Sequence, residues 1–296
     1  MRLGALEAGG TKMVLAVGNE KGEIYEEVSI PTRTPAETVP EMITWFVERK
    51  IEALGIACFG PVDVDPASET YGYILETPKL AWAHYNLLGN LKAGLESALG
   101  YAVPMGIDTD VNGSCLGEMT FGCAKGIDSV LYLTVGTGIG VGISIGGQLV
   151  HGMLHPEGGH IGLIKHPEDP GKSVCPFHGD CLEGLSSGPS IEARWGKKAH
   201  ELVDNEKVWE IESFYLAQGL VNFILTVSPK KIILGGGVMH QEQLFPLIRE
   251  KVKERINGYL RTKELEDMDN YIVPNSLNDQ QGILGAIRLA QLAKEA

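Results

Sequence analysis

The sequence predicts an α/β fold, because short apolar strand patterns alternate along the chain with helical patterns. With 296 residues, 44% of them hydrophobic, the chain is long enough for two packed lobes. No Gly/Ser linker or charged run separates these lobes, so any boundary is a hinge between packed parts. The strand patterns cover Arg2–Leu6, Met13–Gly18, Glu23–Ile30, Ala53–Phe59, Val103–Ile107, Val130–Val135, Gly140–Ile145 and Lys231–Leu234. The helical patterns cover Ala36–Lys50, Asn86–Leu99, Gly113–Phe121, Ser190–Val203, Trp209–Val227, Gln241–Tyr259 and Gly282–Ala296.

The charge balance excludes one class of partner. A net charge of −13 leaves no basic surface to neutralise phosphates, so a nucleic-acid partner is not expected.

The first residues contain no apolar run of secretory length, which predicts a cytoplasmic protein. The uncharged stretch Ser129–Val150 is long enough to span a membrane, but it holds six glycines and alternates from Val130. That pattern predicts a buried hairpin and no membrane partner.

The five cysteines divide into two groups. An odd number cannot be fully paired in disulfides within one chain. Cys58, Cys115 and Cys123 lie among apolar or small residues and are interpreted as buried thiols. Cys175 and Cys181 instead lie in a segment rich in histidine, which is typical of a metal site.

The spacing around these two cysteines predicts zinc. The candidate ligands are His151, His155, His160, His166, Cys175, His178 and Cys181. Cys175, His178 and Cys181 form a compact C-x2-H-x2-C motif, and His160 upstream completes a tetrahedral set with two thiolates. Four protein ligands leave no open position, so the predicted site is structural, whereas a zinc hydrolase using Glu157 as base would need one. His151 and His166 also fit ordinary packed histidines, and the role of His155 stays open.

Three glycine turns predict a phosphate ligand. Leu6–Gly18 and Leu133–Gly147 both read as strand, glycine turn with threonine, and strand. Glycines let successive backbone N–H groups converge on a phosphate oxygen. A third turn, in Lys230–Phe245, follows a strand and precedes a helix. One such turn alone is an ordinary hairpin, and neither a Walker A motif nor an intact G-x-G-x-x-G is present.

Eight motifs, in order, resemble the ROK family of sugar kinases, and within it the bacterial fructokinases. They are EAGGTK (7–12), ACFGPVD (57–63), YGYILETPKLAW (71–82), IDTDVNGSCLGE (107–118), TVGTGIGVG (134–142), HPEGGH (155–160), CPFHGDCLEGLSSG (175–188) and ILGGGV (233–238). The resemblance implies an actin/hexokinase-like, ribonuclease H-like fold of two lobes and a homodimer. The expected lobes are 1–112, with helix 282–296 packed back on it, and 113–281, which contains the zinc loop 155–184.

The resemblance also implies the chemistry. Asp110 corresponds to the general base that accepts the proton of the sugar hydroxyl during attack on the γ-phosphate of ATP. Taken alone, this Asp fits a helix N-cap equally well. Thr109 stands where the general family has Asn, and Glu7 where it has Asp, as in the fructokinase branch. The threonine removes an amide that would contact glucose, and Glu7 is expected to orient Mg²⁺ through water.

The remaining site residues follow by motif. The sugar-binding residues are expected to be Gly60, Pro61, Thr109, Glu157, His160 and Glu183. The phosphates are expected to lie against Gly9, Gly10, Thr11, Lys12, Thr134, Gly136, Thr137 and Gly138. The adenosine is expected to lie against Pro189, Gly235, Gly236, Gly237 and Val238. Lys12 also fits a solvated surface lysine, and Asp63 a turn cap.

The sequence therefore predicts a fructokinase that uses Mg²⁺ and ATP and carries structural Zn²⁺. The alternative is a family kinase for mannose, glucose or N-acetylmannosamine, because a few hydrogen bonds decide sugar selectivity. The family also contains repressors with an N-terminal helix-turn-helix, for which the turn at Glu7 leaves no room.

Overall fold

The computed structural model describes residues 1–296 and divides the chain into two compact units. The first unit comprises Met1–Gly126, Leu149–Pro156 and Ser276–Ala296, and the second comprises Ile127–Gln148 and Glu157–Asn275. These bounds differ from the expected lobe boundary at 112/113, because the helix after residue 109 packs on the C-terminal helix inside the first unit. A division into lobes that move as bodies stays a prediction.

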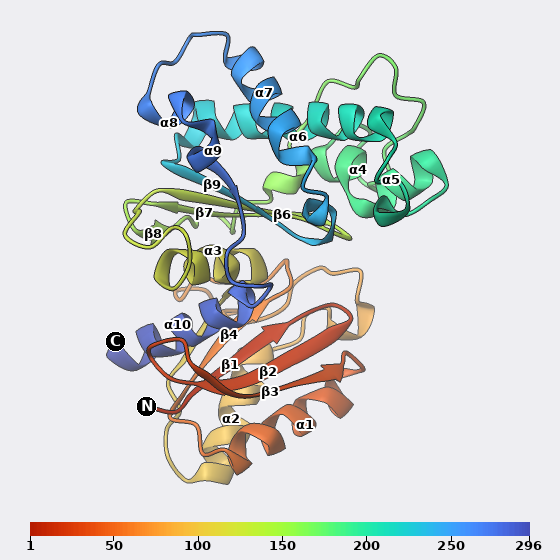
Figure 1. Ribbon diagram of the computed structural model, residues 1–296. Helices are drawn as coiled ribbons and strands as arrows, with labels where there is room; N and C mark the ends of the chain where they lie inside the picture. The colour runs from red at the N-terminus through yellow and green to blue at the C-terminus, as the bar shows by residue number, and fades with distance from the viewer. The chain divides into compact units, whose positions relative to one another are not determined.

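The first unit is built on a mixed five-stranded sheet with the order β3-β2-β1-β4-β5 (Figure 1). Its first three strands form an antiparallel meander, and β4 and β5 run parallel to β1. The strands are β1 (Leu3–Ala8), β2 (Lys12–Gly18), β3 (Ile24–Pro31), β4 (Ala53–Cys58) and β5 (Met105–Thr109). The parallel strands β1, β4 and β5 therefore end at one edge, where Glu7 and Asp110 lie.

The two faces of this sheet carry side chains of different size. Large residues such as Leu6, Leu15 and Ile56 face α1 (Pro35–Glu48) and α2 (Leu87–Leu99). The other face is made mainly of small residues and packs against α10 (Gln281–Glu295). The small residues on that face of the strands are Ala5, Ala16, Ala53, Gly55 and Ala57. Period-2 alternation of size along the strands thus sets how closely each helix approaches.

Helix α10 contacts its neighbours backbone to backbone. A Cβ at Gly55 of β4 would lie 1.8 Å from the Ala286 carbonyl oxygen of α10. A Cβ at Gly285 would lie 1.8 Å from the Gly113 carbonyl oxygen of α3 (Asp110–Thr120). Such contacts are far inside van der Waals distance, so no other residue fits there. Figure 1 shows α3 and α10 side by side.

The second unit is also a mixed five-stranded sheet, with the order β10-β9-β6-β7-β8. Helices α6 and α7 pack together on one side of it (Figure 1). The strands are β6 (Val130–Val135), β7 (Ile139–Ile145), β8 (Gln148–Leu149), β9 (Lys231–Gly235) and β10 (Ile272–Pro274). The helices are α4 (Leu182–Ser186), α5 (Gly188–Trp195), α6 (Glu206–Val227), α7 (Leu244–Ile256), α8 (Lys263–Glu266) and α9 (Met268–Tyr271).

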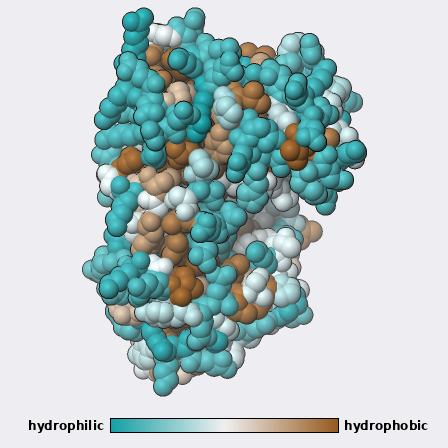
Figure 2. Space-filling view, in the orientation of Figure 1, coloured by the Kyte–Doolittle hydropathy of each residue, from teal (hydrophilic) through white to brown (hydrophobic).

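The predicted α/β fold is confirmed, and the main differences lie at element ends. The predicted helix 190–203 is wrong beyond Trp195, because Gly196 adopts a left-handed conformation that ends the helix. The short strands β8 and β10 were not predicted, since two or three residues carry no periodicity. The stretch 129–150 forms β6, β7 and β8, and no helix is long and apolar enough to cross a membrane. Hydrophilic residues cover most of the face in Figure 2.

The close approach of α10 gives a stability prediction. Gly285→Ala is expected to lower the free energy of unfolding by about 3 kcal/mol or more, because the added methyl group meets the Gly113 carbonyl. Gly152→Ala is the control in the same unit, since its Cβ would lie 3.9 Å from the nearest atom. Urea unfolding measures both variants, and equal stabilities would contradict the packing described.

Candidate active site

The first glycine turn joins β1 to β2. Gly9 N donates to the Lys12 carbonyl at 3.0 Å, and a Cβ at Gly9 would lie 2.6 Å from that oxygen. Thr32 fixes the turn from the side, because its N donates to Thr11 O at 2.9 Å and its Oγ1 donates to Gly9 O at 2.7 Å. Thr11 and Lys12 are exposed. The turn is therefore held by hydrogen bonds and leaves Thr11 and Lys12 exposed to solvent. A fixed turn with backbone N–H groups and a lysine is suited to bind phosphate.

Asp110 is the first residue of α3, directly after β5. The helix cap is Thr109, whose Oγ1 accepts from Asn112 N at 3.1 Å, so capping does not explain Asp110. Burial raises the pKa of Asp110 to about 6, although hydrogen bonds from backbone N–H groups, including Val111 N at 2.9 Å, act against this shift. A carboxylate with a pKa near 6 is poised to accept a proton at neutral pH.

Glu7 shares this environment at the end of β1. Burial, together with the nearby charge of Asp110, raises the pKa of Glu7 to about 7, and the charge of Lys12 acts against this rise. Gly282 of α10 makes room for Glu7, because a Cβ there would lie 2.7 Å from the Glu7 carboxyl group. The negative charge of Asp110 therefore acts on Glu7 next to the first glycine turn.

The segment after β4 carries Gly60 and Pro61, whose peptide bond is cis. Pro61 O accepts from Leu75 N at 2.8 Å, which ties this segment to the chain that follows. Asp63 holds its own loop, because Oδ2 accepts from Ser68 Oγ and Thr70 Oγ1, each at 2.6 Å. These hydrogen bonds agree with the interpretation of Asp63 as a turn cap.

The structure adds a buried carboxylate, which belongs to β5 and lies two positions before Asp110. Asp108, 3% exposed, accepts from Thr109 N at 2.8 Å and from Asn112 Nδ2 at 2.7 Å through Oδ1. Its Oδ2 lies 2.9 Å from His151 Nε2, and this hydrogen bond raises the pKa of His151. His155 Nε2 accepts from Val62 N at 3.3 Å. Neither histidine joins the metal cluster, and the contact was missed because 43 residues separate Asp108 from His151.

In the second unit the other two glycine turns lie against each other. Gly136 N donates to Gly138 O at 2.9 Å, and Gly188 N donates to Gly136 O at 2.8 Å. A Cβ at Gly236 would lie 2.7 Å from Thr134 Oγ1, so the turn after β9 touches the end of β6. The structure thus brings together the predicted phosphate and adenosine residues of this unit. They are Thr134, Gly136, Thr137 and Gly138 of one turn, Gly235, Gly236, Gly237 and Val238 of the next, and Pro189 of α5.

Glu183 lies beside the second turn. Its Oε2 accepts from Ile139 N at 2.9 Å, and a Cβ at Gly138 would lie 2.7 Å from the same oxygen. Glu183 belongs to the first turn of α4, which is capped by Cys181. One carboxylate oxygen thus organises the glycine turn.

The four predicted metal ligands converge in the second unit. The ligand atoms of His160, Cys175, His178 and Cys181 all lie within 4.8 Å of one another. Nδ1 of His160 lies 3.8 Å from Cys175 Sγ and 3.7 Å from Cys181 Sγ, and Nδ1 of His178 lies 3.5 Å from Cys175 Sγ. A zinc tetrahedron with bonds of about 2.3 Å to sulfur and about 2.0–2.1 Å to nitrogen has sulfur–nitrogen edges of about 3.5 Å. The donor set therefore fits zinc.

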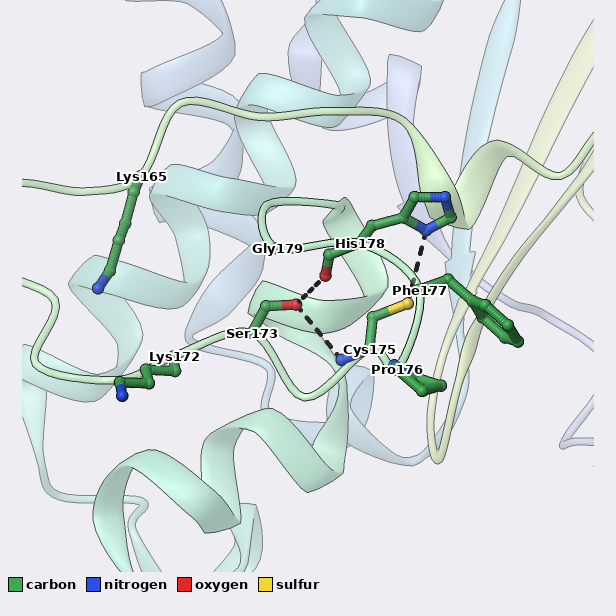
Figure 3. Close-up of a pocket in the computed structure, with 8 residues that line it drawn as sticks. All are labelled: Lys165, Lys172, Ser173, Cys175, Pro176, Phe177, His178 and Gly179. Carbon is green, nitrogen blue, oxygen red and sulfur yellow. Dashed lines mark hydrogen bonds between the residues drawn. The ribbon is translucent and has the colours of Figure 1, made fainter.

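The cluster is formed by the loop itself. Figure 3 shows Cys175 and His178 turned toward one another, while the Phe177 side chain points away. Ser173 holds both ends of this turn, since its Oγ donates to His178 O at 2.7 Å and accepts from Cys175 N at 3.3 Å. His160 follows Glu157 in a turn closed by the bond from His160 N to Glu157 O, 3.0 Å. A metal on His160 Nδ1 would leave Nε2 for another ligand.

The comparisons with known proteins agree with the fold. A model of the ROK family matches residues 3–293, and the chain belongs to this family. A Bacillus subtilis protein named "Putative fructokinase" is 50% identical over 295 residues, covering 99% of this chain and 97% of that one. The fructokinase of Pediococcus pentosaceus is 43% identical, covering 99% of each chain. The ROK hexokinase of Thermus thermophilus has a TM-score of 0.77 at 25% identity, covering 100% of this chain and 99% of that one.

The raised pKa of Glu7 gives a pH-dependent stability prediction. Because the pKa rises on folding, the stability contributed by the protonated form is complete below about pH 4.5 and is lost as pH rises through about 7. Glu7→Gln removes this loss. The free energy of unfolding, measured in urea, is compared for the variant and the unsubstituted protein. The difference is expected to shift in favour of the variant by about 1–3 kcal/mol as the pH is raised from 5 to 8.

Glu52→Gln is the control of opposite sign. The hydrogen bond from Lys294 lowers the pKa of Glu52, so its contribution is present at neutral pH and is lost in acid. Glu52→Gln is therefore expected to be less stable than the unsubstituted protein at pH 8. A Glu7→Gln variant that behaved in the same way would contradict burial as the cause of the Glu7 shift.

Proposed function

We propose that this ROK-family protein is a fructokinase, which transfers the γ-phosphoryl group of ATP to the 6-hydroxyl of D-fructose. The observation that carries the proposal is a buried carboxylate, Asp110, with a pKa near 6 beside a glycine turn. Similarity to the Pediococcus fructokinase over nearly the full length of both chains supports the choice of sugar.

Asp110 would act as the general base. A sugar hydroxyl is a weak nucleophile, and a positioned carboxylate that accepts its proton during attack increases its reactivity. The oxygen then attacks the γ-phosphorus as the bond to the β-phosphate oxygen breaks, and ADP leaves. Thr109 supports Asp110 by capping α3, and its predicted contact with the sugar stays a prediction.

The glycine turns would hold the nucleotide. In the first unit, Gly9, Gly10, Thr11 and Lys12 would contact phosphate oxygens, and in the second the adjoining turns would contact phosphate and adenosine. Mg²⁺ carried by ATP would neutralise phosphate charge, with Glu7 orienting it through water. Exclusion of water from the loaded site would favour transfer to sugar over hydrolysis.

The zinc set would brace the sugar-binding residues. His160, Cys175, His178 and Cys181 supply four ligands, which is the number of a closed structural site. Zinc on His160 Nδ1 would orient Nε2 as a donor to a sugar hydroxyl. Glu157, near the start of the loop 155–184, and Glu183, near its end, would also contact the sugar. Gly60 and Pro61 would contact the sugar from the first unit. The homodimer and the cytoplasmic location stay predictions.

A sugar panel tests the proposal. Coupled ADP release is expected to be fastest with fructose, and slower with mannose, glucose and N-acetylmannosamine. Asp110→Asn is expected to lower kcat by about 10²–10⁴-fold and keep the fold and the zinc. The pH profile of kcat/KM is expected to fall below about pH 6, because the base must be deprotonated.

The possible outcomes separate the parts of this proposal. Preference for another hexose would replace fructose and retain the family chemistry. Near-normal turnover by Asp110→Asn would remove the proposed base, and no turnover with any sugar would overturn the kinase itself.

A zinc variant tests the bracing role. Cys181→Ser is expected to lose the metal, lower the thermal stability and raise KM for fructose about 10- to 100-fold, because His160 loses its orientation. Cys123→Ser, a thiol outside the cluster, is the control. Metal analysis and steady-state kinetics measure both. A zinc-free Cys181→Ser protein that binds fructose normally would show that the loop needs no metal for sugar binding.

A further inference from the structure

Lys79 lies across the first glycine turn, although 69 positions separate it from Gly10. The space that a side chain at Gly10 would fill is taken by the Lys79 stem, since a Cβ there would lie 3.3 Å from Lys79 Cε. The ammonium nitrogen is one bond beyond that carbon. A side chain at Gly10 would therefore press against a lysine that approaches from another segment.

Both sides of this contact are fixed by hydrogen bonds. Lys79 O accepts from Trp82 N at 2.7 Å at the start of η1 (Leu80–Trp82), and the Trp82 side chain is 1% exposed. Trp82 Nε1 donates to Arg33 O at 2.7 Å. The adjacent Thr32 holds Gly9 as described above. The turn and the backbone of Lys79 are thus tied to one another through residues 32–33, which fixes the point from which the lysine side chain extends.

The charge of Lys79 is not neutralised within the protein. Its ammonium group has no ion pair and no hydrogen bond, and neither has that of Lys12. Lys79 is exposed, and the charge of Lys12 acts on the nearby Glu7. A cation whose stem lies against the first glycine turn can contact an anion that binds to the backbone of that turn.

We propose that Lys79 is a second phosphate-binding lysine of the first glycine turn and contacts the terminal phosphate of ATP. The inference rests on the proposed function. The turn follows Glu7, whose pKa shift includes the charge of Asp110, so the turn lies near the proposed base. The reacting phosphate must also lie near that base, because the attacking hydroxyl joins the two.

Nucleotide binding without sugar tests Lys79. Lys79→Met is expected to weaken Mg·AMP-PNP binding about 10- to 100-fold, as for loss of a charged hydrogen bond, and inorganic tripolyphosphate similarly. AMP binding is expected to be unchanged, because AMP has no terminal phosphate. Lys79→Arg is expected to restore AMP-PNP binding to within a few-fold. Isothermal titration calorimetry measures each ligand.

Two further variants control for charge and geometry. Lys92→Met, on the exposed side of α2, removes the same charge and is expected to bind as the unsubstituted protein does. Gly10→Ala would displace the Lys79 side chain, so its effect on AMP-PNP binding is expected to be smaller in the Lys79→Met background. Unchanged thermal unfolding of Lys79→Met would show that the loss is not one of folding.

The results distinguish this inference from the proposed function. If the unsubstituted protein binds AMP-PNP and Lys79→Met binds it equally well, the Lys79 assignment is overturned and the kinase proposal stands. If fructose is not phosphorylated but polyphosphate binding still depends on Lys79, the phosphate site stands and the fructokinase proposal fails. If the unsubstituted protein binds neither AMP-PNP nor tripolyphosphate, both are overturned.

Discussion

Backbone contact between α10 and its neighbours is the constraint on which the first unit depends. Gly55, Gly113 and Gly285 let strand, α3 and α10 approach more closely than any side chain would allow. That approach covers the carboxyl end of the sheet, where Gly282 lies against Glu7. Water is thereby removed from Glu7 and Asp110, and desolvation is the largest cause of both raised pKa values. The close helix packing that these glycines allow is thus what buries Glu7 and Asp110 and raises their pKa values.

The second unit supports its site by other means. Two glycine turns and the start of α5 contact one another through backbone, and Glu183 ties this group to the loop that carries the metal ligands. The middle of that loop is held by a buried ion pair, in which Arg194 Nε donates to Asp169 Oδ1 at 2.7 Å. Tyr215 Oη donates to the other oxygen of Asp169 at 2.6 Å. The loop is thus anchored by protein contacts at Asp169, between His160 and the three metal ligands that follow.

The sequence predicted those features that have a local signature. The α/β fold follows from periodicity, and the C-x2-H-x2-C spacing pointed to the four side chains that the structure brings together. Contacts between distant segments have no such signature. Lys79 against Gly10 and His151 against Asp108 depend on how the chain returns to a sheet edge. The early end of α5 at Gly196 was missed because one left-handed glycine outweighed an apolar pattern that continues beyond it.

The claim that burial poises Asp110 as a base is tested most directly by titration of its carboxyl group. Protein labelled with ¹³C at aspartate carboxyl carbons is titrated by NMR, and Asp110→Asn identifies the resonance. The account predicts a midpoint near pH 6 for that signal, well above the value of about 4 for a solvated aspartate. A midpoint near pH 4 would contradict it, because the carboxylate would then be as well solvated as one on the surface.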